Sequence, residues 1–380
     1  MLPAALLAIA SFLVFYLLIG YPILLSVSRR SAPPVRKDPA YQPSFSILMA
    51  VHNGGEFLQR KLESLLALDY PPHLREILVI SDGSTDDTGA IAASFAGRGV
   101  RLLAVPRGGK AAALNAGLTQ ASGDLLFFTD VRQTLDAQAL THLAANFADP
   151  SVGAVTGELR LLNPAAVGEQ ADMELYWRFE LWLRARHSRI DSIFSATGCI
   201  YALRRSLASP LPPDTIADDG TFSLRAFFRG YRVIFDPAAI AFDYPAAEGG
   251  EFRRRLRTLA GLWQLFVRMP QLFTGADRMR FHFLSYKFGR LVLPWAILLI
   301  VGSTLALPDA RWRNFLIVDE LLLLALAAAD RFVPRAFPLK RVSSPARTFL
   351  AMNVAALLAV LVFFVPAETL WRPTRMQAHR

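Results

Sequence analysis

The chain of 380 residues contains a single cysteine, Cys199, and only six histidines. One cysteine excludes a disulfide framework within the chain, and the histidines show no metal-ligand spacing. Charged residues make up only 19% of the chain, against roughly 25% in an average globular protein. Because 53% of the residues are hydrophobic, intrinsic disorder is excluded as well.

The net charge is strongly positive. Lys and Arg number 41 against 31 Asp and Glu, which gives +10. An excess of this kind is typical of nucleic-acid binding, but also of basic residues that flank membrane spans. The high hydrophobic content favours the membrane, and we expect no nucleic-acid partner.

Long apolar runs lie at both ends of the chain. Residues 2–27 carry no charge, and a membrane span needs about 20 predominantly apolar residues. The alternative is a cleaved signal peptide, but here the basic residues Arg29 and Arg30 follow the run instead of preceding it. We therefore expect an uncleaved anchor over residues 1–28, with its basic side in the cytoplasm.

The C-terminal quarter contains three further apolar segments, and we expect residues 290–380 to form about three transmembrane helices. The segments are Leu291–Leu307, Phe315–Ala329 and Thr348–Val365. The middle segment carries Asp319 and Glu320, which we expect at the outer interface. Buried functional acids are the alternative, because charge inside a membrane is costly.

Residues 29–250 predict a cytoplasmic α/β domain. Continuous apolar runs are typical of buried strands, and leucines at helical spacing indicate the intervening helices. The expected strands are 45–51, 76–80, 100–105, 124–129 and 152–156, and the expected helices are 57–68 and 110–118. This alternation predicts a mostly parallel sheet with helices on both faces, and such sheets bind ligands at the carboxyl ends of their strands.

Two aspartates, Asp82 and Asp130, follow expected strands. Taken alone, an Asp before a Gly-Ser-Thr turn is more often a turn or cap residue than a ligand-binding one. The segment Arg107–Lys110 contains two glycines and opens an expected helix. Helix-start N–H groups favour anions and Lys110 adds a positive charge, so the pattern suits a diphosphate, although such a segment is also typical of a plain loop.

Asp218 and Asp219 precede another helical segment. Adjacent carboxylates raise each other's pKa, which suits a general base. A helix N-cap pair is the alternative interpretation.

Together these motifs resemble the membrane-bound family 2 glycosyltransferases, inverting enzymes that use nucleotide sugars and include cellulose, hyaluronan and chitin synthase-like members. The resemblance covers about residues 45–265. The motifs are His52-Asn53, Asp82–Asp86, Arg107–Lys110, Thr129-Asp130, Gly198–Arg205 and Asp218–Arg225. It implies a GT-A-type, Rossmann-like domain with transmembrane helices at both ends. It also implies that Asp219 is the general base, with Asp218 beside it.

The resemblance places five residues on the donor side. It implies that Asn53 and Asp82 bind the nucleotide, Asp82 at its base or ribose, and that Lys110 contacts the diphosphate. Asp130 matches the first residue of the family's Asp-x-Asp motif, which holds Mg²⁺ or Mn²⁺ together with the diphosphate. Arg132 replaces the second Asp of that motif and cannot ligate a metal. Either the metal is held by fewer carboxylates, or Arg132 takes over part of this role.

On the acceptor side, the resemblance implies a role for Gly198 and for a segment that follows the base. Processive members carry Gln-x-x-Arg-Trp there. In this chain Arg257 matches the Arg, Arg254 and Thr258 replace the Gln and the Trp, and Trp263 follows shortly. We take Arg254, Arg257 and Trp263 as acceptor-binding candidates, and the departures argue against processive polymer synthesis.

Two stretches, Met173–Arg189 and Phe252–Phe273, combine aromatic and basic residues. Basic amphipathic helices with Trp lie well in the interface of an anionic leaflet, so we expect residues 251–289 to contact membrane lipids. Packing on the catalytic domain, with solvated arginine faces, is the alternative.

The combined hypothesis is a multi-pass protein of the bacterial inner (plasma) membrane. It would transfer a hexose from a nucleotide-diphosphate sugar, a UDP-sugar in our reading, to a lipid-linked or growing glycan acceptor at the cytoplasmic face. The product would be a cell-surface polysaccharide or glycolipid. The alternative is a catalytically silent, nucleotide-sugar-binding subunit of a polysaccharide synthesis or export complex, for which Arg132 is the best support.

Overall fold

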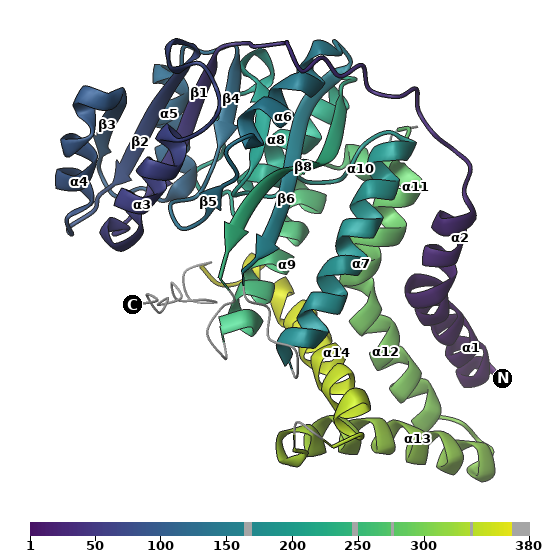
Figure 1. The fold of residues 1–380 in the computed structure, drawn as a ribbon. Coiled ribbons are helices and arrows are strands. Elements are labelled where there is room, and N and C mark those ends of the chain that lie inside the picture. The colour runs from purple at the N-terminus through teal and green to yellow at the C-terminus, as the bar shows by residue number, and fades with distance from the viewer. Residues whose placement is uncertain (163–168, 245–249, 275–276, 335–336, 367–380) are drawn as a thin grey trace. The chain divides into compact units, whose positions relative to one another are not determined.

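The computed structural model describes residues 1–162, 169–244, 250–274, 277–334 and 337–366 (Figure 1). The chain forms two compact units. The helical unit contains Met1–Arg29, Pro164–Leu183 and Ala246–Gln377, and the sheet unit contains Arg30–Asn163 and Arg184–Pro245. This differs from the expected domain over residues 29–250, because Pro164–Leu183 groups with the terminal helices.

The sheet unit is built on one eight-stranded sheet in the order β3-β2-β1-β4-β7-β6-β8-β5. The strands are β1 (Phe45–Val51), β2 (Arg75–Asp82), β3 (Val100–Val105), β4 (Leu125–Phe128), β5 (Thr134–Leu135), β6 (Val152–Leu161), β7 (Tyr201–Arg204) and β8 (Arg232–Asp243). The pairings β3-β2, β2-β1, β1-β4 and β6-β8 are parallel. Strand β7 pairs antiparallel with both β4 and β6, and β5 pairs antiparallel with β8.

The sheet is therefore mixed and not parallel throughout its width. The sequence analysis found the strands of the parallel half, β3-β2-β1-β4, and the first part of β6, but not β5, β7 or β8. Strand β7 is as short as β4, but it ends in Arg204 and lacks the unbroken apolar run that identified β4.

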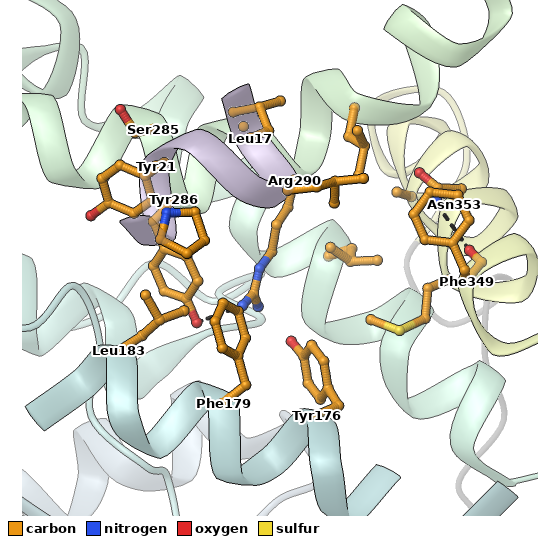
Figure 2. A pocket seen from close by; sticks show the side chains of 17 residues that line it. Leu17, Tyr21, Tyr176, Phe179, Leu183, Ser285, Tyr286, Arg290, Phe349 and Asn353 are labelled. Atoms are coloured by element: carbon orange, nitrogen blue, oxygen red, sulfur yellow. Dashed lines mark hydrogen bonds between the residues drawn. The ribbon is translucent and has the colours of Figure 1, made fainter. Parts of the chain in front are cut away.

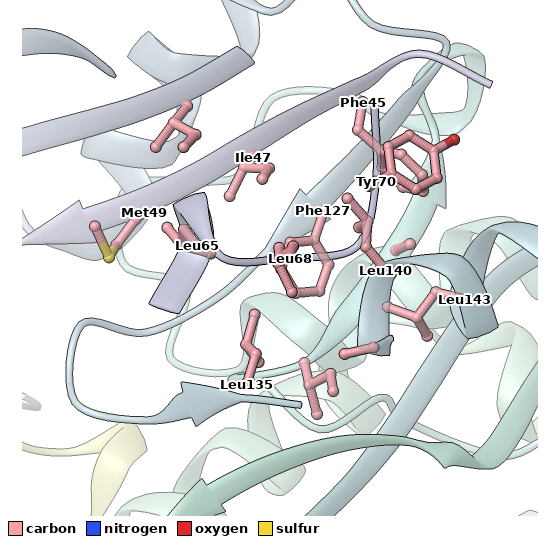
Figure 3. Close-up of a cluster of buried hydrophobic side chains, with 14 of the residues drawn as sticks. Phe45, Ile47, Met49, Leu65, Leu68, Tyr70, Phe127, Leu135, Leu140 and Leu143 are labelled. Carbon is pink, nitrogen blue, oxygen red and sulfur yellow. The ribbon is translucent and has the colours of Figure 1, made fainter. Parts of the chain in front are cut away.

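Helices cover both faces of the sheet, as expected. They are α3 (Gly55–Leu66), α4 (Thr88–Ser94), α5 (Lys110–Gln120), α6 (Ala139–Ala145) and α8 (Asp218–Phe228). Figure 3 shows one face, where Ile47 and Met49 of β1 belong to the same buried cluster as Leu65 of α3 and Leu143 of α6. Because side chains alternate along a strand, Leu48 points to the opposite face.

Helix α5 lies on that opposite face, and Gly117 lets it approach closely. A Cβ at Gly117 would lie 2.8 Å from Leu48 and 2.9 Å from Ile80, so the absent side chain allows the helix to pack directly on β1 and β2. Lys110 is the first residue of this helix. The packing thus fixes Lys110 at the edge where the parallel strands end.

In the helical unit, three helices of the described residues are long and apolar enough to cross a membrane: Leu2–Val27, Arg280–Leu305 and Lys340–Phe363. The first combines α1 (Leu2–Phe15), η1 (Tyr16–Gly20) and α2 (Tyr21–Val27). The second combines α11 (Arg280–Phe283), η6 (Leu284–Phe288) and α12 (Gly289–Leu305), and the third combines α14 (Lys340–Leu358) and η8 (Ala359–Phe363).

The expected middle C-terminal span, Phe315–Ala329, lies in α13 (Ala310–Ala329), which is not among these candidates. The reason is charge, because α13 also contains Arg311 and Arg313 in addition to Asp319 and Glu320. The second candidate span begins at Arg280, so it includes the last part of residues 251–289, which we expected to lie in the interface.

The remaining helices of this unit are α7 (Glu169–Ile190), whose last residues belong to the sheet unit, α9 (Gly250–Arg268) and α10 (Gln271–Thr274). The apolar side of α9 is buried, including Leu256, Ala260 and Phe266, and the helix packs against α14 and η8. The apolar side of α9 therefore packs against other helices of its own unit.

Candidate active site

Asp82 closes β2 and is only 2% exposed. Its carboxylate accepts hydrogen bonds from the Gly108 N–H at 2.7 Å, from the Gly109 N–H at 3.0 Å and from the guanidinium of Arg107. The helix-start N–H groups that the sequence analysis assigned to a diphosphate are therefore engaged by Asp82. In this structure Asp82 holds the loop before α5, and its contact with a nucleotide stays a prediction.

Asn53 stands at the end of β1 in the left-handed backbone region, with a φ of 49°. Its side-chain oxygen accepts a hydrogen bond from the Thr85 N–H at 2.8 Å, and its own N–H donates to the Ser84 hydroxyl at 3.1 Å. These hydrogen bonds link the segment after β1 to the segment after β2. They thereby fix the backbone of the region that is predicted to bind the donor.

Lys110 stands at the centre of a group of carboxylates. Its Nζ lies 3.1 Å from Asp130 Oδ1 and 3.2 Å from Asp218 Oδ1. Burial opposes the charge on Lys110, but the attraction of Asp130, Asp218 and Asp219 outweighs it and raises the pKa of Lys110. The fold therefore gathers residues from the loop after β4 and from the starts of α5 and α8 into one charged cluster.

The two adjacent aspartates have different partners. Asp218 is bonded to Lys110 and also accepts a hydrogen bond from the Tyr201 hydroxyl at 3.3 Å. Asp219 accepts one hydrogen bond at Oδ1, from the Gly220 N–H at 2.7 Å. No hydrogen bond among the described residues reaches Asp219 Oδ2, which leaves this oxygen as an acceptor for a substrate proton.

The environment of Asp219 suits a base. Burial and the neighbouring Asp218 raise the pKa of Asp219 to about 6, against the opposing effect of Lys110. Both aspartates lie in the first turn of α8, where the helix dipole favours carboxylates, but the N-cap residue is Ala217 and no side chain caps the helix, so the N-cap interpretation is wrong. The position of Asp219 at the start of α8 is compatible with a role as general base.

Gly198 lies directly against this carboxylate. A Cβ placed on Gly198 would lie 3.6 Å from Asp219 Oδ2, and no other residue would be nearer. Next to it, the Thr197 hydroxyl accepts a hydrogen bond from Arg184 at 2.7 Å, and the positive charge of Arg184 lowers the pKa of Asp219. The sequence analysis treated Arg184 only as part of an amphipathic stretch.

Gly198 gives the first test of this geometry. We expect Gly198→Ala to leave the melting temperature unchanged and to lower kcat/KM by about 10- to 100-fold, because the methyl group would cover Asp219 Oδ2. Steady-state kinetics and thermal unfolding measure the two effects. Gly89→Ala in α4 is the matched control, since a Cβ there meets nothing within 4 Å. Undiminished transfer by Gly198→Ala would show that the acceptor does not approach Asp219 from this side.

Arg132 forms an ion pair outside the Lys110 cluster. Its guanidinium pairs with Asp243 at the end of β8, and the Gln133 side chain donates to the same carboxylate at 2.8 Å. Asp243 is buried and was not predicted from the sequence. This pairing explains why an arginine stands where the Asp-x-Asp motif has its second aspartate. Arg132 neutralises Asp243, which lies on a neighbouring strand.

Lys61 is a buried cation and is 1% exposed. Its Nζ donates to the Thr129 hydroxyl and to the Gln133 carbonyl, both at 2.7 Å, and burial lowers the pKa of Lys61 to about 8. Lys61 therefore holds the segment that contains Asp130 and Arg132 in place through hydrogen bonds to the residues on either side of it. A sequence signal existed, because Lys61 lies three residues after Leu58 on the apolar face of the predicted helix.

The described side chains of this cluster could hold a divalent metal ion only together with ligands from the substrate. Among the described residues, no group of three or more His, Cys, Asp or Glu side chains could hold a metal ion by itself. Asp130 is 41% exposed, and only its Oδ1 meets Lys110. Mg²⁺ and similar ions are often held by one or two carboxylates together with substrate phosphates, and Asp130 suits such an arrangement.

The predicted acceptor residues Arg254, Arg257 and Trp263 lie in α9 of the helical unit. Arg254 and Arg257 are exposed, and the Trp263 ring makes edge contacts with Phe288 and Phe363. Their role toward an acceptor stays a prediction. In the structure Trp263 contributes to aromatic packing among helices of its own unit.

The chain is similar to known glycosyltransferases. Residues 46–210 match the family model described as Glycosyl transferase family 2. Over 271 residues the chain is 27% identical to the probable glycosyltransferase YdaM of Bacillus subtilis (strain 168), covering 68% of this chain and 64%, a little under two thirds, of that protein. It is also 24% identical to the poly-beta-1,6-N-acetyl-D-glucosamine synthase of Staphylococcus aureus (strain COL), covering 76% and 74% of the two chains.

Among solved structures, the chain resembles the mannosyltransferase PcManGT from Pyrobaculum calidifontis, solved in complex with GDP-Man and Mn²⁺. The TM-score is 0.74 at 23% identity, covering 96% of this chain and 100% of that one. The match to the family 2 model covers residues 46–210, under half of the chain, and the likeness to the solved structure shows the expected GT-A-type fold. Both relatives are named as a glycosyltransferase or a synthase, which favours an enzyme over the silent binding subunit.

Proposed function

We propose that this protein transfers a hexose from a UDP-sugar, with inversion, to a hydroxyl of a lipid-linked or growing glycan acceptor. The observation that carries this proposal is the arrangement around Asp219. Its Oδ2 accepts no hydrogen bond within the described chain, faces Gly198 and lies in one cluster with Lys110 and Asp130. A base beside a cation is what displacement of a diphosphate by a hydroxyl requires.

In the proposed reaction, Asp219 removes the proton of the acceptor hydroxyl. The acceptor oxygen forms a bond to the anomeric carbon while the bond from that carbon to the phosphate oxygen breaks. The nucleoside diphosphate leaves with the electron pair, and the proton stays on Asp219. Lys110 is placed to neutralise the charge that develops on the leaving diphosphate.

The residues around the donor have supporting roles. Asp82 and Asn53 shape the loops at the ends of β2 and β1, and Lys61 holds the segment that carries Asp130. A divalent ion bound by Asp130 and the donor phosphates would act as a Lewis acid on the diphosphate. Arg132 neutralises the buried Asp243 and so stabilises the segment next to Asp130.

We place the reaction at the cytoplasmic face of a bacterial inner membrane. Three candidate spans support attachment to a membrane, and Arg29 and Arg30 directly follow the first of them. The poly-beta-1,6-N-acetyl-D-glucosamine synthase that the chain resembles supports an N-acetylhexosamine or hexose as the transferred sugar and a glycan as the product.

The purified full-length protein should release UDP from one of a panel of UDP-sugars when a lipid extract supplies the acceptor, and mass spectrometry of the lipid fraction should find the added hexose. GDP-mannose is the comparison donor. Turnover with GDP-sugars alone would overturn the choice of UDP. Absence of turnover with every donor and acceptor, in protein that binds UDP, would contradict the proposed reaction.

Metal removal gives a separate test. We expect EDTA to lower turnover by about 10²-fold or more, and Mn²⁺ or Mg²⁺ to restore it, because Lys110 alone cannot neutralise a diphosphate. Calorimetric titration of UDP should show tighter binding with Mn²⁺ than without it. Asp130→Asn should abolish this difference. Equal UDP affinity in EDTA and in Mn²⁺ would exclude a metal at Asp130.

A further inference from the structure

The helical unit contains a pocket of about 240 Å³ (Figure 2). All three candidate membrane spans contribute to its wall, together with α7 and α9. Representative lining residues are Leu17, Tyr176, Phe179, Arg290, Leu293 and Met352. The pocket thus lies among helices that are long and apolar enough to cross a membrane.

Most of the wall is hydrocarbon or aromatic, and several of its polar groups are paired with protein groups. The Ser285 hydroxyl lies 2.6 Å from the Tyr16 hydroxyl, and the Asn353 amide donates to the Phe349 carbonyl at 2.9 Å. A buried water needs two to four polar partners, and most of this wall offers none. Because of this, a hydrocarbon chain suits the interior better than water does.

Arg290 is the exception in this wall. Its Nη2 donates to Glu180 Oε2 at 2.6 Å and to the Tyr286 hydroxyl. Its Nε and Nη1 make no hydrogen bond within the described residues, and its side chain is 25% exposed. Figure 2 shows the guanidinium between Tyr286, Phe179 and Tyr176.

The carboxylate that faces Arg290 is shared. Glu180 Oε1 also lies 3.0 Å from Lys287 Nζ, so one negative charge serves two cations of the same helix. A charge in a membrane-spanning segment is costly and by default marks a functional site. The unused donors of a guanidinium match two oxygens of a phosphate, and such charge-assisted bonds are strong.

We propose that this pocket binds a phosphate-bearing lipid, with a hydrocarbon chain inside the pocket and the phosphate on Nε and Nη1 of Arg290. The volume holds roughly eight water-sized groups, which corresponds to a section of one chain. Since an apolar chain gains little by leaving bilayer lipid for an apolar pocket, the phosphate supplies the selectivity. The proposal concerns binding alone and does not depend on the proposed sugar transfer.

The test uses the full-length protein in dodecyl maltoside and native mass spectrometry, which counts bound lipids. The probes are dioleoyl phosphatidic acid, dioleoylglycerol with the same chains but no phosphate, and inorganic phosphate. We expect one phosphatidic acid per chain with an affinity at least roughly tenfold higher than that of dioleoylglycerol. Inorganic phosphate at the same concentration should not displace it. Equal binding of dioleoylglycerol, or displacement by inorganic phosphate, would overturn the proposal.

Two variants probe the two parts of the pocket. Leu293→Trp fills the apolar part without touching a charge, and Leu298→Trp on the exposed side of the same helix is its control. We expect Leu293→Trp to lose the bound phosphatidic acid and Leu298→Trp to keep it. Arg290→Gln should reduce phosphatidic acid binding to the level of dioleoylglycerol. Unchanged binding in Leu293→Trp refutes the proposal even if Arg290→Gln fails to fold.

Discussion

Replacing Asp219 by asparagine should lower kcat by about 10²–10⁴-fold, the range that general-base catalysis contributes. Asparagine keeps the shape of the side chain and can still accept the Gly220 N–H bond, but it cannot accept the acceptor's proton. Since Asp219 is not among the residues predicted to hold the donor, we expect the UDP affinity to change less than about threefold. Release of UDP and calorimetric titration measure the two quantities.

The matched control is Asp87→Asn, at an exposed aspartate with no side-chain cap bond at the start of α4. Asp87→Asn should transfer sugar at the normal rate. If Asp219→Asn were fully active, Asp219 could not be the base. If Asp219→Asn lost UDP binding and turnover together, its role would be on the donor side.

The second large effect is expected for Lys110→Met. Lys110 contacts Asp130 and Asp218 and lies next to Asp219, so its removal leaves these carboxylates without their common cation. Loss of one group that stabilises developing charge costs about 10²–10³-fold in kcat, and we expect a loss of at least this size. Lys110→Arg, which keeps the charge, should retain more activity than Lys110→Met.

The pH dependence distinguishes this role from a merely structural one. Asp219 acts as a base only when deprotonated, so with a pKa of about 6 activity should be present above pH 6 and fall as the pH decreases through that value. Lys110 lowers the pKa of Asp219, so Lys110→Met should move the half-maximal pH upward. A pH–rate profile of the residual activity measures the shift, and thermal unfolding checks the fold. An unchanged profile in a folded, weakly active Lys110→Met protein would contradict the assigned contact.

Much of the architecture could be predicted because its signals are local. A run such as Phe45–Val51 is apolar throughout, and strand β1 has these bounds. The first apolar run, residues 2–27, matches a candidate span for the same reason. Asp319 and Glu320, by contrast, interrupt the run Phe315–Ala329, and the helix around them includes two arginines as well, so it is not a candidate span.

The partners of each charged residue could not be predicted in this way. Asp82 binds the loop that begins 25 residues later, and Arg132 pairs with Asp243, 111 residues away. These contacts depend on strand order, because β4 lies beside β1, and β5 lies beside β8. A motif predicts that a residue stands at a strand end, but not which side chain of another strand will neutralise it.

The sequence by itself indicated a resemblance to family 2 glycosyltransferases, the apolar segments that could span a membrane, and the acids and the lysine that follow strands or begin helices. Periodicity and turn chemistry act over a few residues, so they can be recognised in a single chain. Only the tertiary structure decided that Asp218 is bonded to Tyr201 and Lys110 while Asp219 Oδ2 faces Gly198. The physical reason is that the availability and pKa of a carboxylate depend on burial and on charges from distant elements, which meet only when the sheet forms.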